Sequence, residues 1–430
     1  MAELVWKGKG RARRARQVSL RTDEVYGDRN GVWCNRLVHG AVERVLPALL
    51  HEHRGKVALV YIDPPFDTGG SFDYRATIPG APEGTPRVAI PAYEDARGLD
   101  AWLTWFHDAA VVLHELLSTG GSLYVHLDAH AAHYAKVLLD EVFGADAFQR
   151  EIVWRIGWVS GFKSRARGWI RNHDTLLFYA KGGRPATFHK EYIPYPDGYV
   201  RRDGSPPRGP GYPIEDVWNG SELDRMDSIQ IMSFSGEKVG YPTQKNEALV
   251  SRVVRASSRP GDLVLDGFVG SGTTAVVAER LGRRWIACDV SPLAIHATRR
   301  RLLTLPTPAP FVVEDAGGSP PSGGALRAHA EVTGRSCTLT LDGYSPRGRA
   351  IPAEARAGVT HWSQWLEGWC VDWEYDGGAL RPGSRAWRTR GTLALSAPHV
   401  HDRPGRYLAR VKVFDVLGGT AARTLRVHVA

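Results

Sequence analysis

The sequence predicts an α/β fold with a doubly wound sheet, followed by a smaller all-β region. Two observations support the α/β part: apolar runs of strand length alternate with helical patterns, and one of these runs leads into a glycine-rich turn. A third observation supports the β part: apolar and polar residues alternate along the last stretch of the chain.

The first apolar run, residues 56–63, ends at a proline pair and is typical of a buried parallel strand. A helical pattern over 102–117 leads to a second run at 121–128. Two further runs, 262–268 and 283–290, are separated by a helical stretch at 274–281. Strands and helices at this spacing indicate a doubly wound sheet with helices on both faces.

The remaining segments differ in composition. Between 150 and 235 the pattern becomes irregular, basic and aromatic, which indicates an insertion, and 305–324 is rich in Pro, Gly and Ser, which favours a linker. The predicted domains are a basic flexible arm (1–22), two halves of the α/β domain (23–149 and 236–304), the insertion (150–235), the linker (305–324) and a β-sandwich (325–430).

Alternating apolar residues from Tyr407 to Val413, the turn Gly418-Gly419 and a second alternation up to Val429 predict a β-hairpin. This last stretch is similar to the final strands of PKD-type immunoglobulin-like modules, and the segment as a whole is expected to form a sandwich. Trp362, Trp365, Trp369 and Trp373 recur at spacings of three and four. We expect them to face a core; the alternative is an exposed recognition surface.

The composition is that of a globular protein, with 43% hydrophobic and 23% charged residues among 430. Because the sequence has no apolar run long enough to span a bilayer and no apolar signal segment, we expect a soluble, cytoplasmic protein without membrane contact. The four cysteines are scattered without a Cys-x-x-Cys pair, which argues against a disulfide framework and a zinc site, and no metal is expected.

Positive charge is concentrated in two segments. Residues 1–22 contain seven Lys/Arg and one Glu, whereas 150–210 contain twelve Lys/Arg and five Asp/Glu. Their net charges of +6 and +7 together exceed the total of +9, so the rest of the chain has a net charge of −4. This distribution favours a polyanion-binding protein over a generally arginine-rich one.

The first strand ends in the turn Asp63-Pro64-Pro65-Phe66. The Asp63 carboxylate and the Pro64 carbonyl are suited to accept hydrogen bonds from the exocyclic NH2 group of a base, while the Phe66 ring stacks on that base. The prolines stiffen the turn and have no N–H donor to compete for these acceptors. Asp-Pro-Pro is also an ordinary turn sequence, so the functional interpretation depends on its position at the end of a buried strand.

A second motif follows the strand at 262–268. Asp266 and Phe268 lead into Gly270 and Gly272, and a helix begins at Thr273 and Thr274. Glycines let the backbone approach a cofactor closely, and the helix N-terminus favours a carboxylate. Asp289, at the end of the next strand, is placed to bind ribose hydroxyls. A dinucleotide site would need a third glycine, and a P-loop would need a lysine after Gly272.

Upstream of this motif stands Gly240-Tyr241-Pro242-Thr243-Gln244-Lys245. Together the three motifs resemble the amino-methyltransferases that modify DNA with S-adenosylmethionine, a family with a Rossmann-like sheet. Since the catalytic motif precedes the cofactor motif, the chain is most similar to the permuted β class and its type III Mod-like members. The resemblance covers most of 33–300 and implies that Thr243, Gln244 and Lys245 contribute to the cofactor pocket.

The same resemblance makes adenine N6 the expected target, because Asp-Pro-Pro is usual in adenine enzymes of the family. Three positions depart from the family pattern: Ala41 stands where aspartate is common, and Asn246 and Gly267 each replace a proline. Ala41 is the departure expected to weaken cofactor binding. Cytosine C5 methylation is excluded, because it needs a cysteine nucleophile, typically after proline, and the sequence has no Pro-Cys pair.

The predicted target-recognition region, 150–235, interleaves aromatic and basic residues from Trp154 to Arg171. Such cations hold phosphates, and arginine also reads guanine edges. The predicted DNA-binding residues are Lys163, Arg165, Arg167 and Arg171. His126 and His173 are not expected to be catalytic, because no nucleophile or metal set accompanies them.

The favoured hypothesis is a site-specific adenine-N6 methyltransferase that acts on a flipped-out base in double-stranded DNA, in a restriction-modification or defence context. One alternative is a cytosine-N4 methyltransferase. Another is a DNA-binding specificity subunit that needs a partner protein, docked on the sandwich, for activity. Methylation of RNA or protein has only the fold in its favour. The oligomeric state is open, and a dimer is compatible with the sequence.

Overall fold

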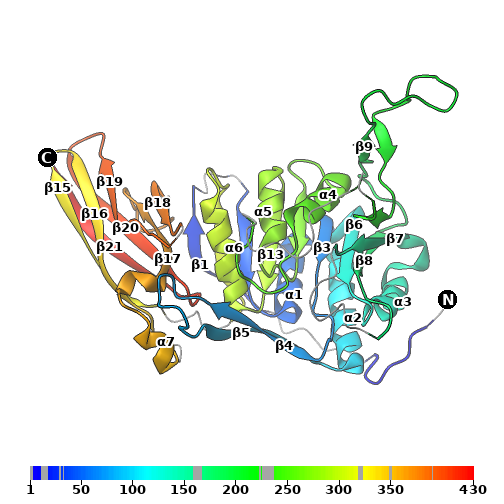
Figure 1. Cartoon of the computed structure of the whole chain (residues 1–430), viewed down its shortest axis with the longest axis horizontal. Helices are drawn as coiled ribbons and strands as arrows, with labels where there is room; N and C mark the ends of the chain where they lie inside the picture. Colours follow the sequence, from blue (N-terminus) through cyan, green and yellow to red (C-terminus); the bar gives the residue numbers. More distant parts are fainter. Residues whose placement is uncertain are drawn as a thin grey trace.

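The computed structural model of the chain describes residues 3–10, 18–28, 31, 33–157, 167–221, 224, 237–317, 323–347, 351–389 and 391–430. A ten-stranded sheet forms the centre of the molecule, and a region built almost entirely of strands adjoins one edge of it (Figure 1).

The central sheet has the strand order β1-β14-β2-β13-β12-β3-β6-β8-β7-β11. Its strands are β1 (Arg21–Tyr26), β14 (Phe311–Asp315), β2 (Asn35–His39), β13 (Arg284–Asp289), β12 (Leu263–Asp266), β3 (Val57–Ile62), β6 (Leu117–Leu127), β8 (His173–Ala180), β7 (Phe148–Arg155) and β11 (Val217–Trp218). The six strands from β14 to β6 are parallel, whereas β8 runs antiparallel to both β6 and β7, and β1 runs antiparallel to β14. The sheet is therefore mixed, with a parallel centre.

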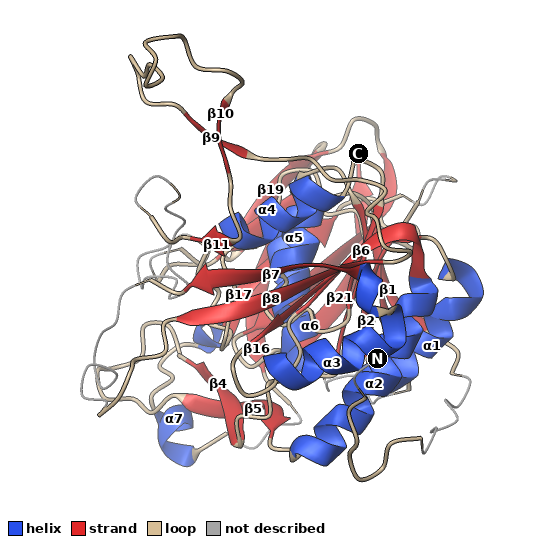
Figure 2. Cartoon of the chain, turned by 90° about the vertical axis from the view of Figure 1, so that its right-hand side faces the viewer, coloured by secondary structure: helices blue, strands red, loops and turns tan. Residues whose placement is uncertain are grey.

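Helices cover both faces of the sheet. One face carries α1 (Val42–His53), α2 (Leu99–Leu116) and α3 (Ala132–Phe143); the other carries α4 (Glu247–Ser257), α5 (Thr273–Arg280) and α6 (Pro292–Thr304). In Figure 2, α2 and α3 lie on the opposite side of β7 and β8 from α4 and α5. The predicted doubly wound α/β fold is confirmed, and each predicted strand and helix of this domain overlaps an observed one.

The chain winds outward from the middle of the sheet in both directions. β3 and β12 lie side by side, with Leu59 paired to Val264, and successive strands then extend toward β6 on one side and β13 on the other. In open α/β sheets, ligands bind at the carboxyl ends of the strands at such a switch point. The two motifs, far apart in the sequence, are therefore brought together at one edge.

The predicted boundaries need two corrections. The segment 305–324 is not only a linker, since Phe311–Asp315 forms β14 in the central sheet, where Phe311 is buried. The region 150–235 likewise includes strands β7, β8 and β11 of that sheet. Prolines around the five-residue β14 obscured that strand, and the irregular, basic sequence around β7, β8 and β11 made the whole segment resemble an insertion. The part of the insertion that leaves the body is the hairpin of β9 (Tyr192–Pro194) and β10 (Gly211–Pro213), which projects outward (Figure 2).

The prediction of a flexible N-terminal arm over 1–22 is wrong for its described parts. Trp6 is buried, and its indole N–H donates to Thr104 Oγ1 at 2.9 Å. Lys9 forms ion pairs with Glu3 and Glu141, and Arg21 opens strand β1. An aromatic ring buried against α2 outweighs the polarity of its neighbours. Residues 11–17 lie outside the described part of the chain.

The C-terminal region contains a three-stranded sheet, β15-β16-β19, and a four-stranded sheet, β18-β17-β20-β21. The strands are β15 (Ala325–Thr333), β16 (Ser336–Ser345), β17 (Leu366–Asp372), β18 (Ser384–Trp387), β19 (Ser396–Val400), β20 (Gly405–Asp415) and β21 (Thr420–Val429), with short helical turns at α7 (Ala353–Ala357) and η3 (Trp362–Trp365). Both sheets contribute to one hydrophobic core, and β20 and β21 form the predicted hairpin. Trp365, Trp369 and Trp373 are buried in this core, as expected, and Trp362 packs at its margin.

A buried charge cluster joins this region to the central sheet. Glu24 on β1 accepts from Arg299 on α6 at 2.9 Å and from Lys412 on β20 at 2.6 Å. Burial alone would raise the pKa of Glu24, but the two cations hold it well below its usual range. Because removing one partner of a buried ion pair is costly, this contact fixes the sandwich against β1 and α6. Among the described helices, none is long and apolar enough to cross a membrane.

Candidate active site

A cavity of about 760 Å³ lies at the carboxyl ends of β3 and β12. This volume is within the usual range for small-molecule sites. The cavity is lined by all four residues of the Asp-Pro-Pro-Phe turn, by Thr243, Gln244 and Lys245, and by Asp266, Phe268, Gly270, Thr273, Thr274 and Asp289. Of the predicted catalytic and cofactor residues only Gly272 is not in the lining, and it lies between Ser271 and Thr273, which are.

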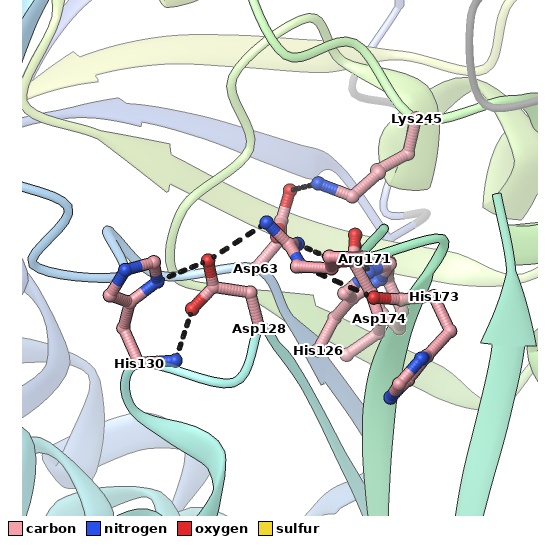
Figure 3. A network of polar contacts seen from close by, with 9 residues as sticks. Asp63, His126, Asp128, His130, Arg171, His173, Asp174 and Lys245 are labelled. Carbon is pink, nitrogen blue, oxygen red and sulfur yellow. Dashed lines mark hydrogen bonds and ion pairs between the residues drawn. The ribbon is translucent and has the colours of Figure 1, made fainter. Parts of the chain in front are cut away.

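The two carboxylate oxygens of Asp63 differ in their hydrogen-bond partners among the described residues. Its Oδ2 forms an ion pair with the Lys245 ammonium group, which arrives from the cofactor half of the domain (Figure 3). Its Oδ1 is buried and has no hydrogen-bond partner in the described part of the chain. A buried acceptor without a partner is costly and is found where a ligand donor supplies the missing bond. Asp63 is therefore prepared to accept an N–H from a bound substrate.

The rest of the catalytic turn is held in place by side chains of neighbouring elements. The Trp102 indole on α2 donates to the Pro65 carbonyl at 2.7 Å. The Phe66 ring lines the cavity, stands nearly parallel to the His126 ring and has the Lys245 ammonium 5.5 Å from its centroid. Phe66 thus presents a fixed aromatic surface on which a base can stack.

The glycine turn depends on backbone conformations that favour glycine. Gly270 and Gly272 have φ angles of 50° and 86°. A Cβ at Gly272 would lie 2.7 Å from Thr298 Oγ1 and 2.8 Å from Thr298 Cα, so α5 approaches α6 closely only because residue 272 has no side chain. The Gly270 N–H donates to Asp289 Oδ2 at 2.9 Å, which ties the turn to the end of β13.

Two carboxylates line this side of the cavity: Asp266 is buried and Asp289 is half-buried. Burial raises the pKa of Asp266 to about 7 and that of Asp289 to about 6. Keeping these two carboxyl groups ionised costs free energy in the ligand-free protein. A ligand that carries positive charge or hydroxyl donors would reduce this cost. The site is consequently suited to a cation that also carries hydroxyl groups.

The segment 242–245 crosses between the two halves of the cavity. Thr243 has φ of 58° and its Oγ1 lies 3.3 Å from the Tyr93 hydroxyl. The Gln244 side chain holds its own loop, because it accepts from Val239 N and donates to the Glu237 carbonyl. Lys245 points to the catalytic turn, where its ammonium group forms an ion pair with Asp63, and it also lines the cavity.

A polar network borders the catalytic turn on the side of β6 and β8 (Figure 3). His126 lies between Tyr61, with Nδ1 3.0 Å from its hydroxyl, and Asp174, with Nε2 3.2 Å from Oδ2. Arg171 pairs with both Asp174 and Asp128. Burial would raise the pKa of Asp174, but the hydrogen bond and charge of His126, with Lys245 and Arg171, hold it below its usual range.

The predicted DNA-binding residues have different environments. Lys163 and Arg165 lie outside the described residues. Arg167 is exposed, whereas Arg171 lines the cavity and is paired with two carboxylates, which fits a role at the target base better than a phosphate contact. Trp154, from the same aromatic run, is fully buried and is a core residue.

No motif in the sequence predicts the cavity wall that follows the catalytic turn. This wall comes from an antiparallel ribbon of β4 (Gly70–Ala76) and β5 (Val88–Asp95), which supplies Phe72, Tyr93 and Asp95 to the cavity. The segment contains no recognisable motif. Its alternation of buried and exposed residues was its only pattern.

Comparison with known proteins identifies the family. The model of a family described as DNA methylase matches residues 57–300, more than half of the chain. The chain belongs to this DNA methylase family. It is 28% identical over 308 residues to the type II methyltransferase M.EcaI of Enterobacter cloacae, covering 57% of this chain and 64% of that protein. It is 26% identical over 284 residues to the DNA adenine methyltransferase YhdJ of Escherichia coli, covering 62% of this chain and 82% of that one.

Among solved structures, the M1.HpyAVI–SAM complex matches with 18% identity and a TM-score of 0.41, covering 63% of this chain and 99% of that one. The chain thus spans less than two thirds of M.EcaI, the first relative above, and nearly all of the M1.HpyAVI chain. The family match ends before the C-terminal sandwich begins.

The cavity of this DNA methylase fits S-adenosylmethionine, the cofactor of the family. Gly270 lines the cavity without a side chain, so a cofactor can approach the backbone closely there. The half-buried Asp289 carboxylate, which also lines the cavity, would accept hydrogen bonds from ribose hydroxyls, and the carboxylates suit a positively charged sulfonium group.

Two of the three departures from the family pattern have structural explanations. Asn246 caps α4, accepting from Leu249 N at 2.8 Å, so it begins the helix as a proline would. Gly267 has room for a Cβ, with its nearest neighbour at 3.4 Å, so nothing there requires glycine. Ala41 precedes α1 without a side-chain cap, and Glu43, two residues later, supplies the acidic group of that wall of the cavity.

Proposed function

We propose that the chain is an S-adenosylmethionine-dependent DNA methyltransferase of the permuted β class that methylates N6 of a flipped-out adenine in double-stranded DNA. The observation that carries the proposal is the arrangement of the Asp63 carboxylate: its Oδ2 pairs with Lys245, and its buried Oδ1 has no partner among the described residues. The Asp-Pro-Pro motif and the adenine specificity named for YhdJ favour adenine.

The chemistry follows from the positions of these groups. The amine lone pair of adenine is delocalised into the ring, so the nitrogen is a poor nucleophile until its N–H bonds are held by acceptors. In this proposal Asp63 Oδ1 and the Pro64 carbonyl accept those two N–H bonds; the unpartnered Oδ1 and the place of both residues in the cavity wall support it. Phe66 holds the ring by stacking, which contributes about 1–3 kcal/mol per base in single-strand binding.

Bound S-adenosylmethionine supplies an electrophilic methyl group. Once methylated, the amine would have to lose one proton, and Asp63 Oδ1 would accept it. Positioning of the nitrogen and the negative charge of Asp63 supply most of the rate enhancement. Base flipping costs a few kcal/mol, which stacking on Phe66 offsets in part.

Basic side chains outside the cavity would contact the DNA backbone. Arg167, with Lys163 and Arg165 beside it in the sequence, is proposed to hold DNA phosphates, and Arg171 to face the flipped base. The sandwich, with two antiparallel sheets around one core, is proposed to be of the immunoglobulin or PKD type. We also propose a cytoplasmic location, a dimeric state and a partner protein from a restriction or defence system.

Cytosine N4 is the second candidate, because its exocyclic amine would present the same N–H donors to Asp63. A partner-dependent specificity subunit is a third, favoured only by the additional sandwich. The intact Asp63–Lys245 pair argues for a chain that carries its own activity.

Replacement of Asp63 by alanine tests the proposal. Asp63→Ala is expected to abolish methyl transfer to DNA while DNA affinity stays within about twofold, because the carboxylate acts on the amine and not on the DNA backbone. Measuring both quantities in purified protein separates the two effects. Loss of DNA binding together with activity would contradict the assigned role.

A further inference from the structure

The β4–β5 ribbon connects the catalytic turn to the C-terminal sandwich. Its first end, where Gly70 pairs with Asp95, lies directly after the Asp-Pro-Pro-Phe turn; its far end, where Ala76 pairs with Val88, lies among the sandwich residues. Figure 1 shows the ribbon running beneath the helices of the central domain toward α7. A single ribbon thus spans the distance between the active site and the additional domain.

At the active-site end, the ribbon fixes the chain that leaves the catalytic turn. The Asp95 carboxylate accepts from the backbone N–H groups of Asp67 and Thr68 at 2.6 and 3.1 Å, and from Thr68 Oγ1 at 2.6 Å. Asp67 has a φ of 60°, and its own carboxylate accepts from the N–H groups of Arg97 and Gly98. The strained conformation at Asp67 is therefore stabilised by the last residue of β5 and by the chain that directly follows it.

The ribbon also forms part of the cofactor wall. Tyr93 stacks on Phe72 with centroids 4.9 Å apart, and its hydroxyl reaches Thr243. On the same face, a Cβ at Gly240 would lie 3.6 Å from the Tyr74 ring, so the ribbon packs against the segment that leads to Thr243. Movement of the ribbon would move this wall of the cavity.

At the sandwich end, the ribbon completes a hydrophobic core. Ala76, Ile78, Val88, Ile90 and Ala92 are buried in one cluster with the inner residues of both sandwich sheets. Tyr241, which lines the active-site cavity, belongs to the same cluster. The ribbon alone, with two strands, would be marginally stable in water, so it depends on this burial.

The loop at the tip of the ribbon has two specific contacts with the sandwich. The Gln364 side chain donates from Nε2 to the Pro79 carbonyl at 3.0 Å, while its Oε1 accepts from the N–H groups of Thr360 and His361. Gly358 faces Thr85 so closely that a Cβ at 358 would lie 2.5 Å from Thr85 Cγ2. The sandwich is itself anchored to α6, because Glu367 accepts from His296 and Arg300 at 3.1 and 3.3 Å.

We propose that the C-terminal sandwich positions the active site: Gln364 and the Gly358–Thr85 contact hold the tip of the β4–β5 ribbon, and the ribbon holds the catalytic turn and the cofactor wall. Gln364 is a positioning residue, since it acts through the ribbon. The inference rests on the proposed function only for the identity of the cofactor, S-adenosylmethionine, and of the substrate.

Two single variants of the full chain loosen the tip in different ways. Gln364→Glu keeps the oxygen that accepts from Thr360 and His361 but removes the donor to Pro79. Gly358→Ala inserts a methyl group against Thr85 at a position with φ of −72°, which alanine adopts without strain. Val429→Ala is the matched control, because Val429 is buried in the same core but pairs with Gly405, at the opposite end of β20 from Asp415, which pairs with Leu366 next to Gln364 and Trp365.

The readout is S-adenosylmethionine affinity by calorimetry, with DNA affinity measured beside it. Gln364→Glu and Gly358→Ala are each expected to weaken cofactor binding by a factor of roughly 5 to 30, as loss of one or two kcal/mol implies. DNA affinity is expected to stay unchanged, and Val429→Ala to bind cofactor as the unaltered chain does. Adding Thr85→Ala to Gly358→Ala leaves only the Cβ of residue 85, at 3.3 Å, and is expected to restore cofactor affinity.

Unchanged cofactor affinity in both folded variants would overturn the proposal, as would an equal loss in Val429→Ala. If neither variant folds, hydrogen exchange in the unaltered chain decides: the amides of Ala76 and Val88 are expected to exchange as slowly as the sandwich core, and fast exchange would overturn the proposal. Cofactor affinity does not require methyl transfer. A chain that responds as expected but leaves DNA unmethylated would therefore refute the proposed function and not the positioning role.

Discussion

Alanine at position 272 tests the link between the glycine turn and the packing of α5 on α6. Gly261 provides a matched comparison, because it has the same φ of 86° and no atom within 4 Å of an added Cβ. Both substitutions incur the left-handed backbone penalty of about 1–2 kcal/mol. Only Gly272→Ala also forces a Cβ to within 2.8 Å of the Thr298 backbone, and overpacking of this kind costs about a further 1–3 kcal/mol.

Urea unfolding of the two variants should thus show a larger loss of unfolding free energy for Gly272→Ala, by about 1 kcal/mol or more. Cofactor titration should show weakened binding for Gly272→Ala alone, because Gly272 lies between Ser271 and Thr273, which line the cavity, whereas Gly261 has no neighbour in the lining. Trimming Thr298 should not rescue the variant, since its Cα is one of the two close atoms. Equal losses in the two variants, with cofactor binding retained, would refute the explanation.

Three further predictions concern charge. Lys245→Met is expected to destabilise the fold by roughly 3 kcal/mol, because it leaves the mostly buried Asp63 carboxylate unpaired, and to abolish methyl transfer; a fully active variant by radiometric assay would contradict this. Because burial raises the pKa of Asp289 to about 6 and of Asp266 to about 7, these two groups reduce the stability of the ligand-free protein as pH rises from about 4 to 7. If the cofactor binds the ionised form of Asp289, its affinity should fall about tenfold from pH 8 to pH 5, because Asp289 is mostly protonated at pH 5. Calorimetry would measure this change, and an affinity that does not vary with pH would exclude a bond to ionised Asp289. Arg167→Gln is expected to weaken DNA binding uniformly and to reduce the salt slope by about 0.9, whereas an unchanged slope would remove that residue from the phosphate contacts.

The sequence predicted correctly those elements whose conformation is determined by a single local pattern. The apolar strands that end in Asp63 and Asp266 are continuous and buried, so the turns that follow them were identified correctly. The pairing of β3 with β12 then brings these turns together, as the switch-point rule requires.

Other features depend on tertiary contacts that no local pattern reveals. Trp6 sits in a basic segment but is buried against α2, and Phe311–Asp315 forms a strand within a proline-rich stretch because β2 and β1 pair with it. The ribbon that carries Tyr93 has no motif, and its role became visible only from its contacts at both ends.

The network around His126 illustrates the same limit. No sequence pattern connects His126 with Asp174, which lies on another strand. The antiparallel pairing of β6 and β8 brings His126 Nε2 to 3.2 Å from Asp174 Oδ2. Likewise, the resemblance placed Lys245 in the cofactor pocket, but only the structure shows that its ammonium fixes the catalytic carboxylate.

The most direct test of the central claim is nucleoside mass spectrometry of unmethylated DNA after incubation with the purified chain and labelled S-adenosylmethionine. The geometry at Asp63 predicts N6-methyladenine, with the label in the new methyl group and none formed by Asp63→Ala. N4-methylcytosine as the product would contradict the adenine assignment, and no labelled base, despite cofactor and DNA binding, would contradict a chain that methylates DNA by itself.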